Sequence, residues 1–130
     1  MLIRRAISVH NQLVQATSRG TLVLALSTTC KFCAESVPFY QHLLQSADNT
    51  LALPIQAVFP NSESDVSDFA KKVGANLSAA SAQDFRSLHI YGTPTIALVD
   101  SSGKVRKIWK GMLSKDQEHE ILEVVQHGRV

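Results

Sequence analysis

The chain has 130 residues and a formal net charge of +2. This length is enough for one hydrophobic core without help from disulfides or metal, so we expect a single domain over residues 1–130. The small charge, with no run of more than two Lys or Arg residues, argues against nucleic-acid binding. No segment is apolar for long enough to cross a bilayer, so we expect no stable membrane span in this chain.

The first half of the chain alternates helical and strand patterns. Apolar residues at helical spacing predict a helix over residues 3–18, and Gly20 provides its stop. The apolar run Leu22 to Leu26 is typical of a central strand that is buried on both faces. A second helix is expected from Cys30 to about Ser46, kinked by the internal Pro38.

The middle of the chain continues the same alternation. A strand is predicted from Leu53 to Phe59. The next helix is expected to begin after Ser62 and to end at Gly74, because apolar residues between them recur every three or four positions. A further short helix is predicted over residues 82–88.

The C-terminal part predicts a hairpin followed by a helix. Thr95 to Val99 and Lys104 to Lys110 read as antiparallel strands joined by a turn, with an edge or bulge in the second strand. Ser114 to Gln117 forms a capping-box pattern that opens a last helix, closing near Gly128. Because strands alternate with helices and a hairpin follows, we expect an α/β fold with a mixed central sheet and helices on both faces.

The only two cysteines lie three residues apart in Cys30-Lys31-Phe32-Cys33. This spacing suits a reversible disulfide and cannot connect distant parts of a fold. The Thr-rich stretch before Cys30 predicts that a helix opens there, and a helix N-terminus stabilises a thiolate. We therefore expect Cys30 to be the nucleophile, with its pKa lowered by the helix end and by Lys31, and Cys33 to be the resolving thiol.

Two other interpretations of the cysteine pair are weighed against this one. A zinc site needs four ligands, but the chain has no second CxxC and no pair of histidines at the usual spacing, so we expect no metal. Two unreactive core cysteines are the other alternative. Their place between a strand and a helix argues against it.

A second signal is Gly92-Thr93-Pro94-Thr95, which enters a predicted strand. Proline at a strand start removes a hydrogen-bond donor, and X–Pro is the only peptide bond at which the cis form is common. Alone, this proline could be merely structural. Together with the cysteine pair, this proline becomes a specific signal of a redox site.

These motifs resemble those of the thioredoxin superfamily over nearly the whole chain, with Pro38 five residues after Cys33. The Gly-Thr-Pro-Thr loop and the long segment before it are similar to those of TlpA/ResA-type thiol–disulfide oxidoreductases. The resemblance implies a thioredoxin-like fold in which Pro94 is cis and packs against the cysteines. It also implies that the Thr93 backbone pairs with substrate. The Lys31-Phe32 dipeptide is unlike the Gly-Pro of thioredoxin, and we expect both residues to contact the substrate, with Phe32 part of an exposed docking surface.

The chain departs from the family pattern at two helper positions. Thr29 stands where most members have tryptophan before the first cysteine. Leu24 stands where thioredoxins have a buried aspartate that helps to deprotonate the resolving thiol. Glu35 is near in sequence, but a carboxylate in the first turns of a helix is more often solvated or a partner of the helix dipole.

The expected function is thiol–disulfide exchange with protein thiols and disulfides, without a cofactor, by a monomer served by an upstream redox partner protein. A peroxiredoxin-like peroxidase is one alternative, although Val23 occupies the position of that family's proline. A redox-inert binding module is another. The resemblance favours a periplasmic or other extracytoplasmic location, but the N-terminus shows no signal peptide and a cytoplasmic location stays open. Thiolate stabilisation at Cys30 predicts a potential above that of thioredoxin (~−270 mV).

Overall fold

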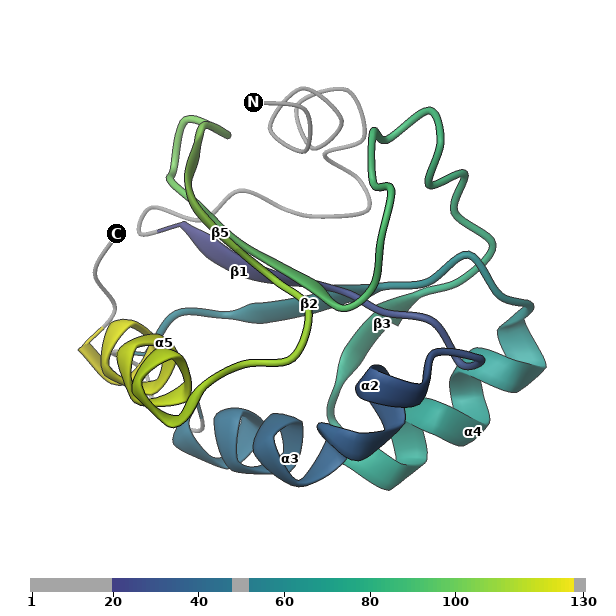
Figure 1. The fold of residues 1–130 in the computed structure, drawn as a ribbon, viewed down its shortest axis with the longest axis horizontal. Helices are drawn as coiled ribbons and strands as arrows, with labels where there is room; N and C mark the ends of the chain where they lie inside the picture. The colour runs from purple at the N-terminus through teal and green to yellow at the C-terminus, as the bar shows by residue number, and fades with distance from the viewer. Residues whose placement is uncertain (1–19, 48–51, 128–130) are drawn as a thin grey trace.

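The computed structural model describes residues 20–47 and 52–127. Five strands form one mixed sheet in the order β3-β2-β1-β4-β5 (Figure 1). β1, β2 and β3 run parallel to one another, whereas β4 is antiparallel to both β1 and β5. The strands are β1 (Thr21–Ala25), β2 (Ile55–Val58), β3 (Ser78–Ala80), β4 (Thr95–Val99) and β5 (Val105–Lys110).

The four described helices lie together on one face of this sheet (Figure 1). They are α2 (Lys31–Glu35), α3 (Val37–Ser46), α4 (Glu63–Val73) and α5 (Lys115–His127). The expected α/β fold with a mixed sheet is confirmed. Helices were expected on both faces; the helix predicted over residues 3–18 lies outside the described residues. No described helix is both long and apolar enough to cross a membrane.

The central strand β1 separates two apolar layers, which explains its unbroken apolar sequence. Leu22, Leu24 and Leu26 face the helices and join the main core. Val23 and Ala25 face the opposite side, because side chains alternate along a strand. A strand buried on both faces fixes the position of the loop that follows it, and this loop carries the cysteines.

The segment between β3 and β4 differs from expectation, since the helix predicted over residues 82–88 is wrong. Hydrogen-bonded turns occupy residues 85–89, where the Leu88 N–H donates to the Asp84 carbonyl at 3.0 Å. Ala82 and His89 have positive φ angles of 54° and 59°. Because a right-handed α-helix needs negative φ angles, neither residue can be part of one. Leu88 and Ile90 are buried against the second face of the sheet.

The helix after Cys30 is divided into α2 and α3 rather than merely kinked. Ser36 separates the two helices, and Pro38 lies in the first turn of α3. Proline has no N–H to donate to the carbonyl four residues before it, so one continuous helix would lose that hydrogen bond. In the first turn of a new helix the same residue is well tolerated.

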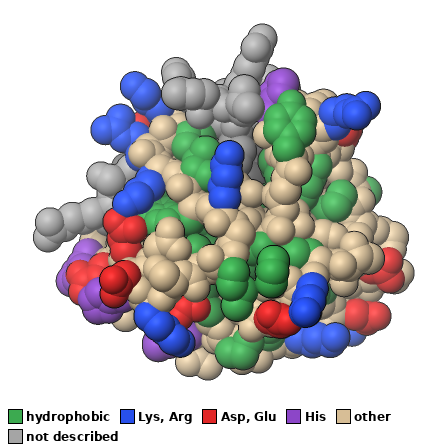
Figure 2. All heavy atoms as spheres, viewed as in Figure 1, with side chains coloured by type: hydrophobic (Ala, Val, Ile, Leu, Met, Phe, Trp, Pro, Cys, Tyr) green, Lys and Arg blue, Asp and Glu red, His purple; other side chains and the backbone are tan. Residues whose placement is uncertain are grey.

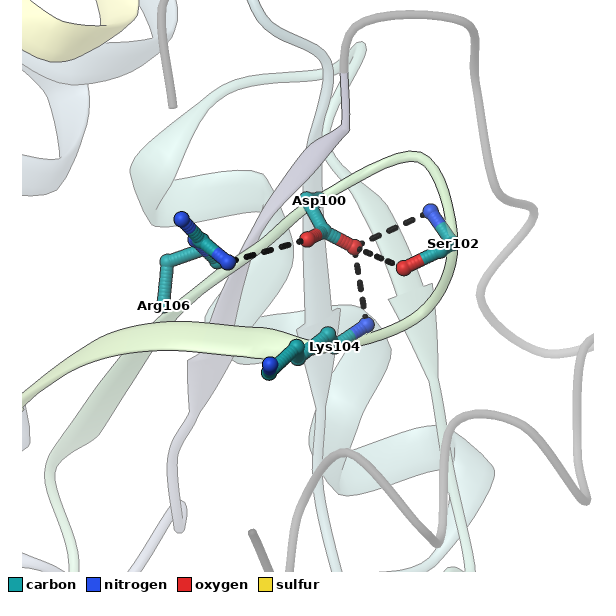
Figure 3. Close-up of polar contacts among 4 residues, drawn as sticks. All are labelled: Asp100, Ser102, Lys104 and Arg106. Carbon is teal, nitrogen blue, oxygen red and sulfur yellow. Dashed lines mark hydrogen bonds and ion pairs between the residues drawn. The ribbon is translucent and has the colours of Figure 1, made fainter.

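The hairpin between β4 and β5 is organised by one carboxylate (Figure 3). An Asp100 oxygen accepts hydrogen bonds from the Ser102 hydroxyl (2.6 Å), the Ser102 N–H (3.0 Å) and the Lys104 N–H (2.9 Å). Its second oxygen lies 3.7 Å from the Arg106 guanidinium. A register shift at Leu98 and Val99 confirms the irregularity expected in this hairpin. The hairpin presents Pro94 and Lys110 at the end of the sheet next to the cysteines.

Capping side chains fix the beginnings of α4 and α5 as the sequence predicts. The Ser62 hydroxyl accepts from the Asp65 N–H at 3.4 Å. Ser114 and Gln117 exchange hydrogen bonds, each side chain accepting from the other residue's N–H at 3.1 and 2.9 Å. This reciprocal capping box confirms the predicted start of the last helix.

Candidate active site

Cys30 is the N-cap residue of α2, at the end of the loop that leaves β1. Its backbone is extended (φ −89°, ψ 120°), and its sulfur accepts a hydrogen bond from the Cys33 N–H at 3.1 Å. N-cap residues usually provide a side-chain oxygen for this purpose. Here the thiol sulfur fills the same role, so the helix end directs a free N–H at the atom that would carry negative charge.

The Cys30 thiol also lies against the proline loop. Its sulfur is 3.5 Å from the Thr93 carbonyl oxygen, to which the thiol donates. The Thr93–Pro94 peptide bond is cis, as expected, and Pro94 is buried. The Thr95 hydroxyl donates to the Gly92 carbonyl at 2.7 Å and holds the loop in place. Residues 63 positions apart in sequence therefore meet at one sulfur atom.

The pKa of Cys30 is lowered from its ordinary value. Partial burial acts to raise it, but hydrogen bonds from the side chains of Cys33 and Thr93 and from the backbone N–H groups of Cys33 and Phe32 outweigh that effect. Hydrogen bonds, rather than Lys31, are the main causes that lower this pKa. The Lys31 ammonium lies 3.9 Å from the Glu35 carboxylate on an exposed flank of α2, with 83% of the Lys31 side chain exposed. A contribution of Lys31 to the Cys30 pKa stays a prediction.

Cys33 lies one turn further along α2 and is fully buried. Burial, together with the neighbouring Cys30, raises the pKa of the Cys33 thiol to about 12. The pKa values of the two thiols are thus shifted in opposite directions.

Within residues 20–47 and 52–127, no cluster of three or more His, Cys, Asp or Glu side chains is arranged to hold a metal ion.

Two buried hydroxyl groups lie behind Cys33, and the sequence analysis did not identify them. The Ser36 hydroxyl donates to the Met112 sulfur at 3.6 Å, and Ser36 is hydrogen-bonded to the Tyr40 side chain. Burial raises the pKa of Tyr40, and the nearby thiols add to this effect. The spacing of Ser36 and Tyr40, three and seven residues after Cys33, is the signal that places them on the same side of the helices.

Leu24, at the position of the family's buried aspartate, has no group that could accept a proton from Cys33, and the nearby Glu35 is engaged on the surface of α2. Leu24 is 1% exposed and belongs to the apolar core. Glu35 is exposed and ion-paired with Lys31. Cys33 is therefore part of the apolar core, and the polar groups that act on it are Cys30, the Ser27 backbone and the Thr93 side chain, with Tyr40 close by.

Apolar side chains are exposed around the reactive sulfur. Phe32 is 47% exposed beside Cys30 in sequence, and Met112 is 50% exposed where its sulfur contacts Ser36. Figure 2 shows hydrophobic side chains gathered between the charged ones on the face that includes the helix layer and the sheet end. Exposed apolar groups beside a reactive thiol are the composition expected of a surface that contacts other proteins.

Comparisons with known proteins agree with this geometry. A family model for the thioredoxin-like domain matches residues 9–126. The thiol-disulfide oxidoreductase ResA of Geobacillus thermodenitrificans is 25% identical over 122 residues, which cover 90% of this chain and 69% of ResA.

Solved structures show the same fold at lower sequence identity. A secreted disulfide oxidoreductase of Mycobacterium tuberculosis superposes with a TM-score of 0.68 at 11% identity, over 84% of each chain. The exposed lipoprotein thioredoxin of Streptococcus pneumoniae gives a TM-score of 0.66 at 21% identity, over 85% of this chain and 88% of that one. With the family model spanning most of its length, the chain belongs to the thioredoxin-like domain family.

Proposed function

We propose that this protein is a thiol–disulfide oxidoreductase that exchanges disulfides with protein substrates, using Cys30 as nucleophile and Cys33 as resolving thiol. The observation that carries the proposal is the opposite shift of the two thiol pKa values at a helix N-terminus beside the Thr93–Pro94 loop. The similarity to ResA supports the same reaction class.

The reaction needs only the two cysteines and the substrate disulfide. The Cys30 thiolate attacks one substrate sulfur, the substrate S–S bond breaks, and the other substrate sulfur leaves as a thiolate that takes up a proton. Cys33 then loses its proton and attacks the Cys30 sulfur. The mixed disulfide breaks, the second substrate thiolate leaves, and two electrons have passed from enzyme to substrate. The reverse sequence oxidises a substrate dithiol.

Four residues around the sulfur are proposed to contact the substrate. The Thr93 carbonyl and N–H would pair with an extended substrate segment, as in β-strand addition, and Pro94 would form the floor beneath it. Phe32 and Lys31 lie exposed beside Cys30. Phe32 would contribute apolar contact area and Lys31 a charge at the rim.

The lowered pKa of Cys30 also bears on the direction of electron flow. A stabilised thiolate stabilises the reduced form, which makes the pair more oxidising. We therefore keep the expectation of a potential above that of thioredoxin (~−270 mV), now attributed to hydrogen bonds at the helix end rather than to Lys31. Equilibration with a glutathione buffer measures this directly, and a potential at or below that of thioredoxin contradicts it.

The cellular setting is proposed from the relatives. Two structural relatives are described as secreted and as an exposed lipoprotein, which supports an extracytoplasmic location for this chain. There it would act as a single-domain monomer, and an upstream redox partner protein would restore the redox state of its cysteine pair after each reaction. Sedimentation of the purified protein tests the monomer, and a tagged full-length gene product fractionated between compartments tests the location.

Reduction of insulin in the presence of dithiothreitol tests the reaction. Wild type should accelerate the precipitation of insulin chains, and both Cys30→Ser and Cys33→Ser should abolish the acceleration. Cys33→Ser should accumulate a covalent adduct with the substrate that dithiothreitol releases, whereas Cys30→Ser should form none. No acceleration by wild type would favour a redox-inert module. Peroxide turnover that depends on Cys30 and exceeds disulfide exchange would favour a peroxidase.

A further inference from the structure

A cavity of about 530 Å³ opens beside the proline loop, on the face of the sheet opposite the described helices. It is lined by residues 89–95 together with Ile108, Lys110 and Gly111 of the β5 end. Cavities of ~300–1,000 Å³ are large enough to take a ligand or a group of side chains. Thr93 belongs both to this lining and to the contacts of the Cys30 sulfur, so the cavity lies next to the loop that touches the reactive sulfur.

The walls of this cavity are mainly apolar and include an aromatic ring held by a neighbour. Tyr91 is 74% exposed at the cavity, and Ile108 of β5 is 37% exposed. The His89 Nδ1 atom lies 3.0 Å from the Tyr91 hydroxyl, and the two rings meet edge to face with centroids 6.3 Å apart. These contacts keep a large apolar surface in contact with solvent at a defined position.

The charge of the lining has one sign. Lys110 contributes a full positive charge, and no Asp or Glu is among the lining residues. Among the described residues, Lys110 has no ion-pair partner, in contrast to Lys107 on the same strand, which pairs with Glu120. An unpaired cation beside exposed apolar groups is complementary to an apolar side chain that is flanked by a carboxylate.

We propose that this cavity binds an apolar residue of the substrate protein that has an acidic neighbour, a few residues from the reacting cysteine. The inference rests on the proposed function, which it extends to substrate choice. A substrate strand that pairs with Thr93 has to continue past Pro94 in one direction or the other. On the cavity side its apolar side chain enters between Tyr91 and Ile108, and the neighbouring carboxylate reaches Lys110.

The test uses short peptides that each carry one cysteine as a mixed disulfide with thiopyridine. Reaction with the reduced full-length protein releases thiopyridone, and its absorbance gives the rate. One set of peptides has Leu-Glu a few residues before or after the cysteine, a second set has Leu-Lys at the same positions, and a third set has Gly-Glu there. The protein variants are Lys110→Glu, Lys110→Gln and Tyr91→Ala. Lys72→Gln on α4 and Tyr91→Phe are the matched controls.

Wild type should react several-fold to about tenfold faster with Leu-Glu than with Leu-Lys at low ionic strength, and added salt should shrink this ratio. Lys110→Gln should remove the preference, Lys110→Glu should reverse it, and Lys72→Gln should keep it. Tyr91→Ala should lower the preference for Leu-Glu over Gly-Glu several-fold, whereas Tyr91→Phe should retain most of it.

Dithiodipyridine, which has no peptide, and insulin are included to separate two kinds of failure. Equal peptide rates with normal reactivity toward both reagents overturn the cavity inference and leave the proposed function intact. A loss of preference in Lys72→Gln as large as in Lys110→Gln also overturns it, because the effect is then one of overall charge. Absence of insulin reduction by wild type defeats the proposed function itself.

Discussion

Separating the two thiols by mutation should reveal titrations shifted in opposite directions. In Cys33→Ser, Cys30 keeps the N–H groups of residues 32 and 33 and the Thr93 side chain, so its pKa should stay below its ordinary value. In Cys30→Ser, the Cys33 thiol stays buried but loses the neighbouring thiolate. Its pKa should therefore fall below the value of about 12 that it has beside Cys30, yet stay above that of a free cysteine.

The size of this separation can be worked from the structure. With a pKa of about 12, only about one Cys33 thiol in 10⁵ is ionised at pH 7, whereas a free cysteine with a pKa of ~8.5 is ionised at a few per cent. Iodoacetamide should therefore alkylate Cys30 selectively at neutral pH. The loss of a nearby negative charge when Cys30 enters a disulfide should also make Cys33 easier to deprotonate, at the step where the reaction needs its thiolate.

Ultraviolet absorbance of the thiolate against pH measures both values in the reduced single-cysteine variants, with alkylation rates as a second measurement. The reasoning is refuted if Cys30 in Cys33→Ser titrates at or above the pKa of free cysteine. It is also refuted if Cys33 in Cys30→Ser titrates at the free value, because burial then has no effect on this thiol.

Three further predictions concern neighbouring groups. Thr93→Val should raise the pKa of Cys30, because it removes a hydrogen bond that lowers it; the absorbance titration measures the change, and an unaltered pKa contradicts the assignment. Leu24→Ala should lower the free energy of unfolding by about 2–5 kcal/mol in urea, since it opens a cavity at a 1% exposed core position. Asp100→Asn should lower thermal stability at neutral pH, and the difference from wild type should shrink in acid. Hydrogen bonds from Ser102 and Lys104 hold the folded pKa of Asp100 below its unfolded value of ~3.9, so the stability it contributes is present above that value and is lost as pH falls through the folded pKa.

Controls for these variants come from the same chain. Asp68→Asn changes an exposed carboxylate on α4 that lies outside the hairpin network, and it should leave the acid dependence of stability unchanged. If Asp68→Asn and Asp100→Asn behave alike, the hairpin network is not the source of the effect. If Leu24→Ala unfolds at the same urea concentration as wild type, the core around β1 is less tightly packed than its burial indicates.

The parts of the fold that the sequence predicts are those with strong local patterns. β1 and β4 are buried over their whole length and apolar after an initial threonine, and α4 and α5 carry regular apolar stripes with capping residues. β3 was not anticipated, because Ser78 to Ala80 contains no β-branched or aromatic residue. It is a strand because it pairs with β2, where the Gln56 and Ser78 side chains hydrogen-bond at 2.7 Å.

The features of the site that belong to a sequence motif could be predicted. The features that depend on the direction in which a side chain points could not. The spacing of Cys30 and Cys33 at a helix start and the nature of Thr93–Pro94 follow from residue types and order. The ion pair of Lys31 with Glu35 depends on the pairing of residues four apart on α2. Likewise, the loss of a helix over residues 82–88 depends on two left-handed residues that the composition does not reveal.

The complete burial of Cys33 has a consequence for how long a captured partner stays attached. A large partner can reach only the Cys30 sulfur, so every encounter begins with the same covalent bond. Its release waits for a thiol that sits among apolar side chains and rarely ionises. The lifetime of the covalent complex is then set from inside the protein, by the polarity around one atom, rather than by the affinity of the outer surfaces. Substitutions at Ser36 or Tyr40 should lengthen or shorten that lifetime without altering which partners are captured.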